Sequence, residues 1–112
     1  MPKAAIIETN GSITIKNVGE NEINPIVGGY IEFIPFGKDA IAYCNEEGKM
    51  KRLPMNPLAT RLARDRKIGL MRDDYLVGTI VIFGPGDGEG GESDVTPELI
   101  SQLPKANIVE GL

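Results

Sequence analysis

Short segments in which apolar and polar residues alternate predict strands in the first half of the chain. Residues 3–8 and 12–16 form a hairpin, because the Asn-Gly dipeptide at 10–11 between them is typical of a two-residue hairpin turn. Residues 30–35 and 39–44 predict two further strands, which a proline and a glycine separate. The pattern therefore predicts four strands before residue 45.

Two helices are predicted by a capping residue that is followed by proline at the first helical position. Asn56 opens the first helix, which ends near Lys67, and Thr96 opens a shorter one. Residues 80–83 are apolar on both faces and predict a buried central strand. Residues 17–29 are rich in Asn, Glu and Gly, so they predict a connection with room for one helical turn.

These elements predict an α+β fold with a small, mostly antiparallel twisted sheet of about five strands and two short helices. A length of 112 residues suits a single domain. Within it, residues 84–94 are rich in glycine and acids and predict a flexible loop, and residues 104–112 predict a loosely docked tail. We also expect the strand at 12–16 to lie at a sheet edge, where it could pair with a second copy in a homodimer.

The chain has one cysteine, Cys44, and no histidine, and both facts restrict its chemistry. Without histidine the commonest general base and imidazole ligand are missing, so we expect no metal site and predict no cofactor. A single thiol cannot form an internal disulfide, which suits a reducing compartment. The apolar run that ends at Ile7 is too short for a signal peptide or a membrane span, so we expect a cytoplasmic protein with no membrane contact.

Charge is distributed unevenly along the chain. Residues 49–72 hold eight of the twelve basic residues and one acid, Asp65, for a net charge of +7, whereas the remaining four bases and fifteen acids carry −11. A helix surrounded by lysine and arginine suits phosphate or carboxylate ligands, so this segment predicts binding of nucleic acid or a nucleotide. The alternative is a solvated helix face that acids such as Asp73 and Asp74 neutralise in the fold.

Polar residues beside the basic segment could complete a ligand pocket, formed by the turn after residue 44 and the start of the helix at 56. Loop residues next to a rigid scaffold often carry function. The alternative is purely structural, with Asn45 as a turn residue and Asn56 as a helix cap. The candidate ligand-binding residues are Asn45, Glu46, Lys49, Lys51, Arg52, Asn56, Arg61, Arg64, Arg66 and Lys67.

No residue pattern in the chain demands catalysis. Glu32, Glu46 and Glu47 could supply a carboxylate pair for acid–base chemistry, but their spacing does not require one. The glycine loop lacks the Lys-Ser/Thr ending of a phosphate-binding loop and carries acids that repel phosphate. Cys44 ends an apolar strand, where a small buried side chain is the expected role. An enzyme that uses carboxylates is therefore the third alternative, after two kinds of binding protein.

Four motifs follow one another along the chain: VGGYIE at 27–32, CNEEGK at 44–49, LPMNPLA at 53–59 and GTIVI at 78–82. This succession resembles the domain-of-unknown-function family 3846, and the resemblance covers about residues 3–103. Members of that family are short proteins found in bacteriophages, bacterial genomes and mobile elements. The resemblance implies a compact domain of phage or mobile-element origin, located in the host cytoplasm if a phage encodes it, and it implies no particular activity.

Two departures from the family pattern are local. The connection at residues 17–26 is shorter and less helical than the resemblance leads us to expect, and the glycine loop is longer. Either difference could alter a binding edge.

Two functions follow from these observations as expectations. The first is a small accessory protein, not an enzyme, that binds nucleic acid or a nucleotide through the basic segment at 49–72. The second is a protein–protein inhibitor or adaptor that binds a host factor, such as a defence or transcription component. The acidic balance of the rest of the chain favours the second, because it suits charge steering toward a basic partner.

Overall fold

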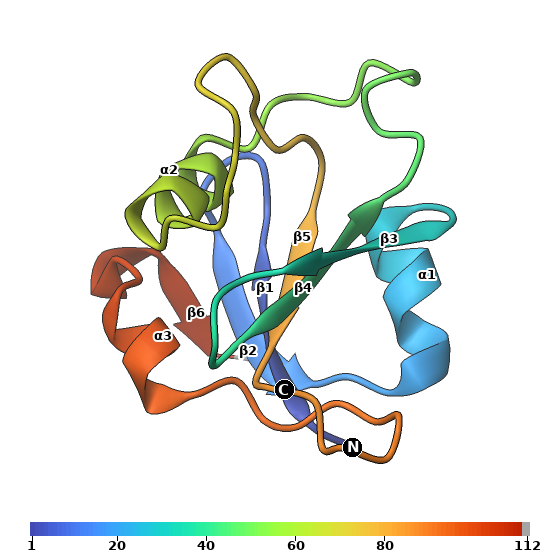
Figure 1. Cartoon of the computed structure of the whole chain (residues 1–112), viewed down its shortest axis with the longest axis vertical. Coiled ribbons are helices and arrows are strands. Elements are labelled where there is room, and N and C mark those ends of the chain that lie inside the picture. The colour runs from blue at the N-terminus through green and yellow to red at the C-terminus, as the bar shows by residue number, and fades with distance from the viewer. Residues whose placement is uncertain (111–112) are drawn as a thin grey trace.

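A twisted six-stranded sheet runs through the protein in the computed structural model, which describes residues 1–110 (Figure 1). The strand order is β3-β4-β5-β1-β2-β6, and every neighbouring pair is antiparallel except β2 and β6. The strands are β1 (Lys3–Ile7), β2 (Ile13–Asn17), β3 (Ile31–Pro35), β4 (Ile41–Asn45), β5 (Ile80–Phe83) and β6 (Ile108–Glu110).

Short helices cover both faces of this sheet. Figure 1 shows α2 and α3 on one side of the sheet and α1 on the other. The helical segments are the 3₁₀ helix η1 (Glu20–Glu22), α1 (Ile23–Val27), α2 (Pro57–Asp65), α3 (Pro97–Ser101) and the 3₁₀ helix η2 (Lys105–Asn107). The predicted α+β class with a mostly antiparallel sheet is confirmed.

The sheet separates two hydrophobic cores, because successive side chains of a strand point to opposite faces. In β1, Ala5 and Ile7 face α2 and α3, whereas Ala4 and Ile6 face α1. The fully buried members of the larger core are Ala5, Ile7, Ile13, Phe36, Ala42, Ala59, Ala63, Ile80, Ile82 and Leu99. The smaller core contains Ala4, Ile6, Val18, Ile23, Val27, Val81 and Phe83.

The connection between β2 and β3 is more helical than the sequence indicates. It forms η1 and then α1, whose buried Ile23 and Val27 cover the smaller core. Gly28 ends α1 with a left-handed backbone (φ 84°), and its N–H bonds to the carbonyl of Asn24. Glycine adopts this conformation without strain, so it allows the chain to turn into β3.

The sixth strand is the main difference from the sequence prediction. Residues 108–110, in the segment expected to form a loosely docked tail, pair in parallel with β2. Asn107 directs this pairing, because its side-chain amide donates to the carbonyl of Gly11 at 3.0 Å. The expectation that strand 12–16 lies at a sheet edge is therefore wrong, since β2 has β1 on one side and β6 on the other. A homodimer through that strand would have to displace β6.

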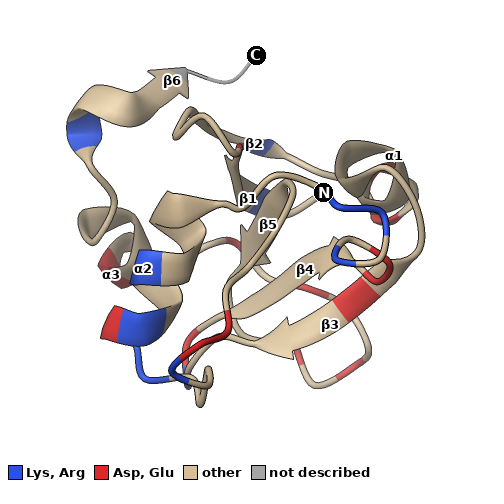
Figure 2. Cartoon of the chain, turned by 90° about the horizontal axis from the view of Figure 1, so that it is seen from above, with Lys and Arg blue, Asp and Glu red and all other residues tan. Residues whose placement is uncertain are grey.

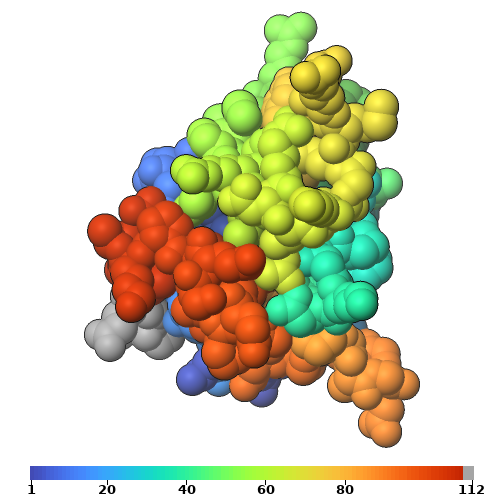
Figure 3. Space-filling model, turned by 60° about the vertical axis from the view of Figure 1, so that its left-hand side comes forward, coloured from blue at the N-terminus to red at the C-terminus, as the bar shows by residue number. Residues whose placement is uncertain are grey.

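Residues 84–94 form a loop that projects from the body of the molecule, the orange protrusion in Figure 3. The Asp87 carboxylate organises its tip by accepting the backbone N–H groups of Glu89 at 2.7 Å and Gly91 at 2.9 Å. These bonds hold the pKa of Asp87 below its usual value, because they stabilise the charged form. The tip is thus a defined turn, and the flexibility of the loop stays a prediction.

Both ends of this loop are fixed to the sheet. Tyr43 on β4 donates its hydroxyl to Glu92 at 2.7 Å, and burial together with this bond raises the pKa of Tyr43 to about 12. A Cβ atom on Gly84 would lie 2.0 Å from the carbonyl oxygen of Asp94. Only glycine therefore fits where the two ends of the loop meet.

Asn56 joins α2 to the end of β1 and to the segment just before β5. Its side-chain oxygen caps the helix by accepting the N–H of Ala59 at 3.0 Å. Its amide nitrogen donates to the carbonyls of Ile7 at 3.0 Å and Gly78 at 2.9 Å. The side chain is fully buried, so water cannot replace these bonds.

We expect Asn56→Ala to destabilise the protein by about 3 kcal/mol, because it removes a helix cap and two further buried hydrogen bonds. Urea unfolding measures this loss, and Asn21→Ala, at an exposed asparagine, is the control. A loss no larger than about 1 kcal/mol would show that only the cap matters.

Candidate functional site

A cavity of about 360 Å³ opens at the β3–β4 end of the sheet, and we call it the edge cavity. Its floor comes from β3 and β4, and its walls come from the turn after β4 and the loop at 68–77. The lining residues are Glu32, Ile34, Cys44, Asn45, Glu46, Lys49, Met50, Ile68, Gly69, Leu70, Met71, Asp74, Tyr75, Leu76 and Val77.

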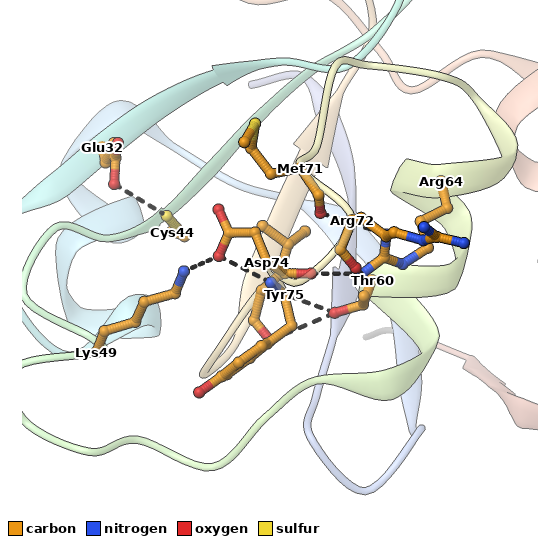
Figure 4. Close-up of polar contacts among 10 residues, drawn as sticks. Glu32, Cys44, Lys49, Thr60, Arg64, Met71, Arg72, Asp74 and Tyr75 are labelled. Atoms are coloured by element: carbon orange, nitrogen blue, oxygen red, sulfur yellow. Dashed lines mark hydrogen bonds and ion pairs between the residues drawn. The ribbon is translucent and has the colours of Figure 1, made fainter.

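The floor of the edge cavity places a carboxylate beside a thiol. Glu32 and Cys44 are opposite one another in the antiparallel pair β3–β4, so their side chains lie on the same face. The Cys44 thiol donates to the Glu32 carboxylate with a sulfur–oxygen distance of 3.8 Å (Figure 4). Cys44 is buried, whereas Glu32 is exposed toward the opening.

An ion pair joins the two walls of the cavity. Lys49, from the turn after β4, reaches across to the Asp74 carboxylate of the facing loop (Figure 4). Its ammonium also lies over the ring of Tyr75, 5.1 Å from the ring centroid. The hydrogen bond from Lys49 is the main cause that lowers the pKa of Asp74, and the backbone N–H of Tyr75 adds to it. A carboxylate and an aromatic face thus hold one cation at the mouth of the cavity.

Helix α2 holds the facing loop in position. Arg64 donates to the carbonyls of Met71 at 3.4 Å and Arg72 at 3.1 Å, and also to that of Asp74. The Thr60 hydroxyl accepts the backbone N–H of Leu76 at 2.9 Å. These bonds attach the irregular loop at 68–77 to helix α2. The helix therefore holds this wall of the cavity in place.

Large apolar side chains stand exposed around the opening. Met50 is 80% exposed, Met71 is 74% exposed and Tyr75 is 41% exposed. Apolar groups of this size gain free energy when a partner covers them, by about 25 cal/mol for each Å² removed from water. The rim can therefore contact a partner, and the floor can receive a side chain from it.

Ion pairs within the chain engage half of the eight basic residues at 49–72. Figure 2 shows basic and acidic segments interspersed along the backbone in the view from above. Four ion pairs are formed: Lys49 with Asp74, Lys51 with Glu47 at 3.7 Å, Arg61 with Asp65 at 4.0 Å, and Arg66 with Asp39. Arg52, Arg64, Lys67 and Arg72 form no ion pair within residues 1–109.

Arg66 serves the fold, because its side chain is only 9% exposed. It donates to the carbonyl of Phe36 at 2.8 Å, to the Asp39 carboxylate and to the side chain of Gln102. The guanidinium thus ties the end of α2 to the turn between β3 and β4 and to α3. A ligand at the surface could not reach this charge without breaking those bonds.

The two asparagines of the predicted ligand pocket are also structural. Asn45 is 5% exposed, donates to the carbonyl of Val27 at 3.1 Å and accepts the N–H of Glu47 at 2.8 Å. Asn56 lies in the core, with its amide engaged by three backbone groups. Neither amide is available to a ligand, because each is already bonded within the fold. The hypothesis that they contact a ligand is not supported by their positions.

Of the predicted residues, only Glu46 and Lys49 lie in the edge cavity with side chains open to it. Sequence reasoning missed the contribution of Met50, Met71 and Tyr75. The apolar residues of 68–77 follow neither the spacing of a strand nor that of a helix. The sequence of this segment therefore does not indicate that it lies opposite the turn after β4. Methionines beside a basic run were the one available indication, since exposed methionine is common at adaptable binding surfaces.

Metal ligands and the reactivity of the thiol can be assessed in the part of the chain that the structure describes. No group of three or more His, Cys, Asp or Glu side chains there is placed to hold a metal ion. Burial, with the nearby Glu32 charge as a second cause, raises the pKa of Cys44 to about 12. The thiol therefore stays protonated at neutral pH and is a poor nucleophile.

We expect the Cys44 thiol to react with iodoacetamide at pH 8 about 10³-fold more slowly in the folded protein than in urea, because reaction needs the thiolate. Mass spectrometry after timed quenching measures both rates. Equal rates in the folded and unfolded states would contradict the raised pKa and the burial of the sulfur.

Comparison with known proteins gives one finding about relationship. No curated protein and no solved structure matches the chain. No helix within residues 1–110 has the length and apolar character needed to cross a bilayer. The family described as domain of unknown function (DUF3846) matches residues 2–107, which is nearly the whole sequence. The chain therefore belongs to the DUF3846 family.

Proposed function

We propose that this DUF3846 protein is a non-enzymatic binding protein that holds a protein partner at the edge cavity. The observation that carries the proposal is the exposure of Met50, Met71 and Tyr75 around a concave site. Exposed apolar groups that are gathered together commonly mark interaction surfaces, and methionine adapts its shape to different partners. The protein would then act as an inhibitor or adaptor.

The class of partner follows from the origin that the sequence motifs imply. For a small protein of phage or mobile-element origin, binding to a host component is the action that this proposal assigns. The partner in this proposal is a host protein, such as a component of defence or transcription. The raised pKa of Cys44 supports a binding role over a nucleophilic one, because the only thiol of the chain is held protonated.

Binding of an anionic ligand is the second candidate. A shallow depression beside α2 is lined by Arg64, Lys67 and residues 68–70, and it has no acidic side chain in its lining. Lys67 and the nearby Arg72 have no ion-pair partner among residues 1–109. Ion pairs engage Lys49, Lys51, Arg61 and Arg66, and this favours the protein partner over nucleic acid, because fewer cations remain for phosphate contacts.

The first proposal is tested by affinity capture from host lysate. We expect wild type to capture one protein in stoichiometric amount, and the double variant Met50→Ser/Met71→Ser to capture at least tenfold less. Met55→Ser is the matched control, because Met55 is 47% exposed but does not line the cavity. Equal capture by all three proteins, or capture of nucleic acid alone, would contradict the proposal.

The second candidate predicts salt-dependent binding to a DNA or RNA oligonucleotide. In a fluorescence titration at several salt concentrations, Lys67→Ala/Arg72→Ala should reduce the log–log salt slope by about 2, roughly 1 for each lost phosphate contact. Lys105→Ala, an exposed lysine of η2, should leave the slope unchanged. Binding that is absent or indifferent to salt would exclude this candidate.

A further inference from the structure

We infer that the edge cavity receives an arginine or lysine side chain of the partner protein, held by the carboxylates of Glu32 and Glu46. This inference rests on the proposed function and specifies the chemistry of the partner. The basic segment alone predicts an anionic ligand, whereas this inference gives a cationic one. The reason is that the segment at 49–72 has a net positive charge, but the cavity lining contains more carboxylates than cations.

The charges that line the cavity favour a cation. They are three carboxylates, from Glu32, Glu46 and Asp74, and one ammonium, from Lys49. Lys49 forms an ion pair with Asp74, whereas Glu32 and Glu46 form no ion pair within residues 1–109. The thiol between the β-strands is protonated and adds no charge. An anion would therefore meet uncompensated carboxylates, and a cation would neutralise them.

Lys49 shows how this cavity binds a cation. Its ammonium lies between a carboxylate, that of Asp74, and the face of an aromatic ring, that of Tyr75 (Figure 4). The combination of a charge partner with a ring face is a common way for proteins to hold ammonium and guanidinium groups. Glu32 and Glu46, which form no ion pair, line the same cavity. Their negative charges provide a second position for a cation, as Asp74 does for Lys49.

The apolar part of the lining suits the stem of a long basic side chain. Ile34 in the floor and Leu70 in a wall are half-buried, and Met50 and Met71 lie around the opening. Lysine and arginine bury their methylene groups against such surfaces while the charge meets polar groups. A volume of about 360 Å³ is near the lower end of ligand pockets, which span roughly 300–1,000 Å³, so the cavity fits a side chain and its immediate neighbours.

A protein is the source of this cation in our proposal, rather than a free amine. The two methionines of the rim, Met50 and Met71, are 80% and 74% exposed, and a free amine inside the cavity would leave most of their surface in water. Residues on either side of an inserted arginine would cover them. A buried cationic anchor surrounded by apolar contacts is typical of the energetic centre of a protein interface.

Three acetylated and amidated tripeptides test the inference with the full-length protein: Leu-Arg-Leu, Leu-Gln-Leu and Leu-Glu-Leu. We expect Leu-Arg-Leu to shift the backbone NMR signals of residues 44–50 and 68–77, and to bind at least tenfold more tightly than the other two. Glu32→Gln/Glu46→Gln should weaken Leu-Arg-Leu about tenfold and leave Leu-Gln-Leu unchanged. Glu98→Gln, at an exposed acid on α3, should change neither affinity.

The outcomes separate this inference from the function on which it rests. If Leu-Gln-Leu binds the cavity as tightly as Leu-Arg-Leu, the cavity is an apolar site and the inference is wrong, although the capture experiment can still support a protein partner. If Leu-Glu-Leu binds most tightly, or if no peptide shifts the cavity signals at millimolar concentration, the inference is also wrong. If the Met50→Ser/Met71→Ser variant loses capture of the partner but wild type shows no preference for Leu-Arg-Leu over the other peptides, the proposed function is supported and this inference is not.

Discussion

The buried amide of Asn56 is the interaction on which the arrangement of the protein depends. It fixes the start of α2 to the end of β1 and to Gly78, just before the neighbouring strand β5, in one set of hydrogen bonds. Helix α2 then positions Arg64 and Thr60, and these two side chains hold the loop that faces the β4 turn. The edge cavity is therefore a consequence of a contact in the core, although its lining residues lie at the surface.

The regular elements could be predicted from the sequence because their signals are local. The Asn-Gly dipeptide at 10–11 lies in the β1–β2 hairpin, Asn56 caps α2 as expected, and the apolar run at 80–83 is the central strand β5. Strand β6 has no such signal, since its three residues become a strand only where β2 offers an unpaired edge. The helical turn in residues 20–27 likewise depends on a core that those residues help to cover.

The candidate site was harder to predict because closeness along the chain is not closeness in space. The basic segment at 49–72 appears as one cluster in the sequence, yet acids from outside it neutralise several of its members. Asp39 reaches Arg66 from the β3–β4 turn, and Asp74 reaches Lys49 from the loop before β5. A count of charges in a window therefore gives the composition of the segment, but it does not show which of its cations stay without an ion pair. The lining of the edge cavity instead contains three carboxylates and one ammonium, so its net charge is negative.

The position of β1 at the centre of the sheet has a consequence for how the chain acquires its structure. Ile6 of β1 pairs with Val81 of β5, so the middle of the sheet forms only after a very long loop has closed. Closing such a loop costs chain entropy before any long-range contact offsets it, and proteins built this way fold slowly. During synthesis, the β1–β2 hairpin therefore has no β5 to pair with until most of the polypeptide has left the ribosome. Until then the apolar strand β1 stays unpaired along one edge.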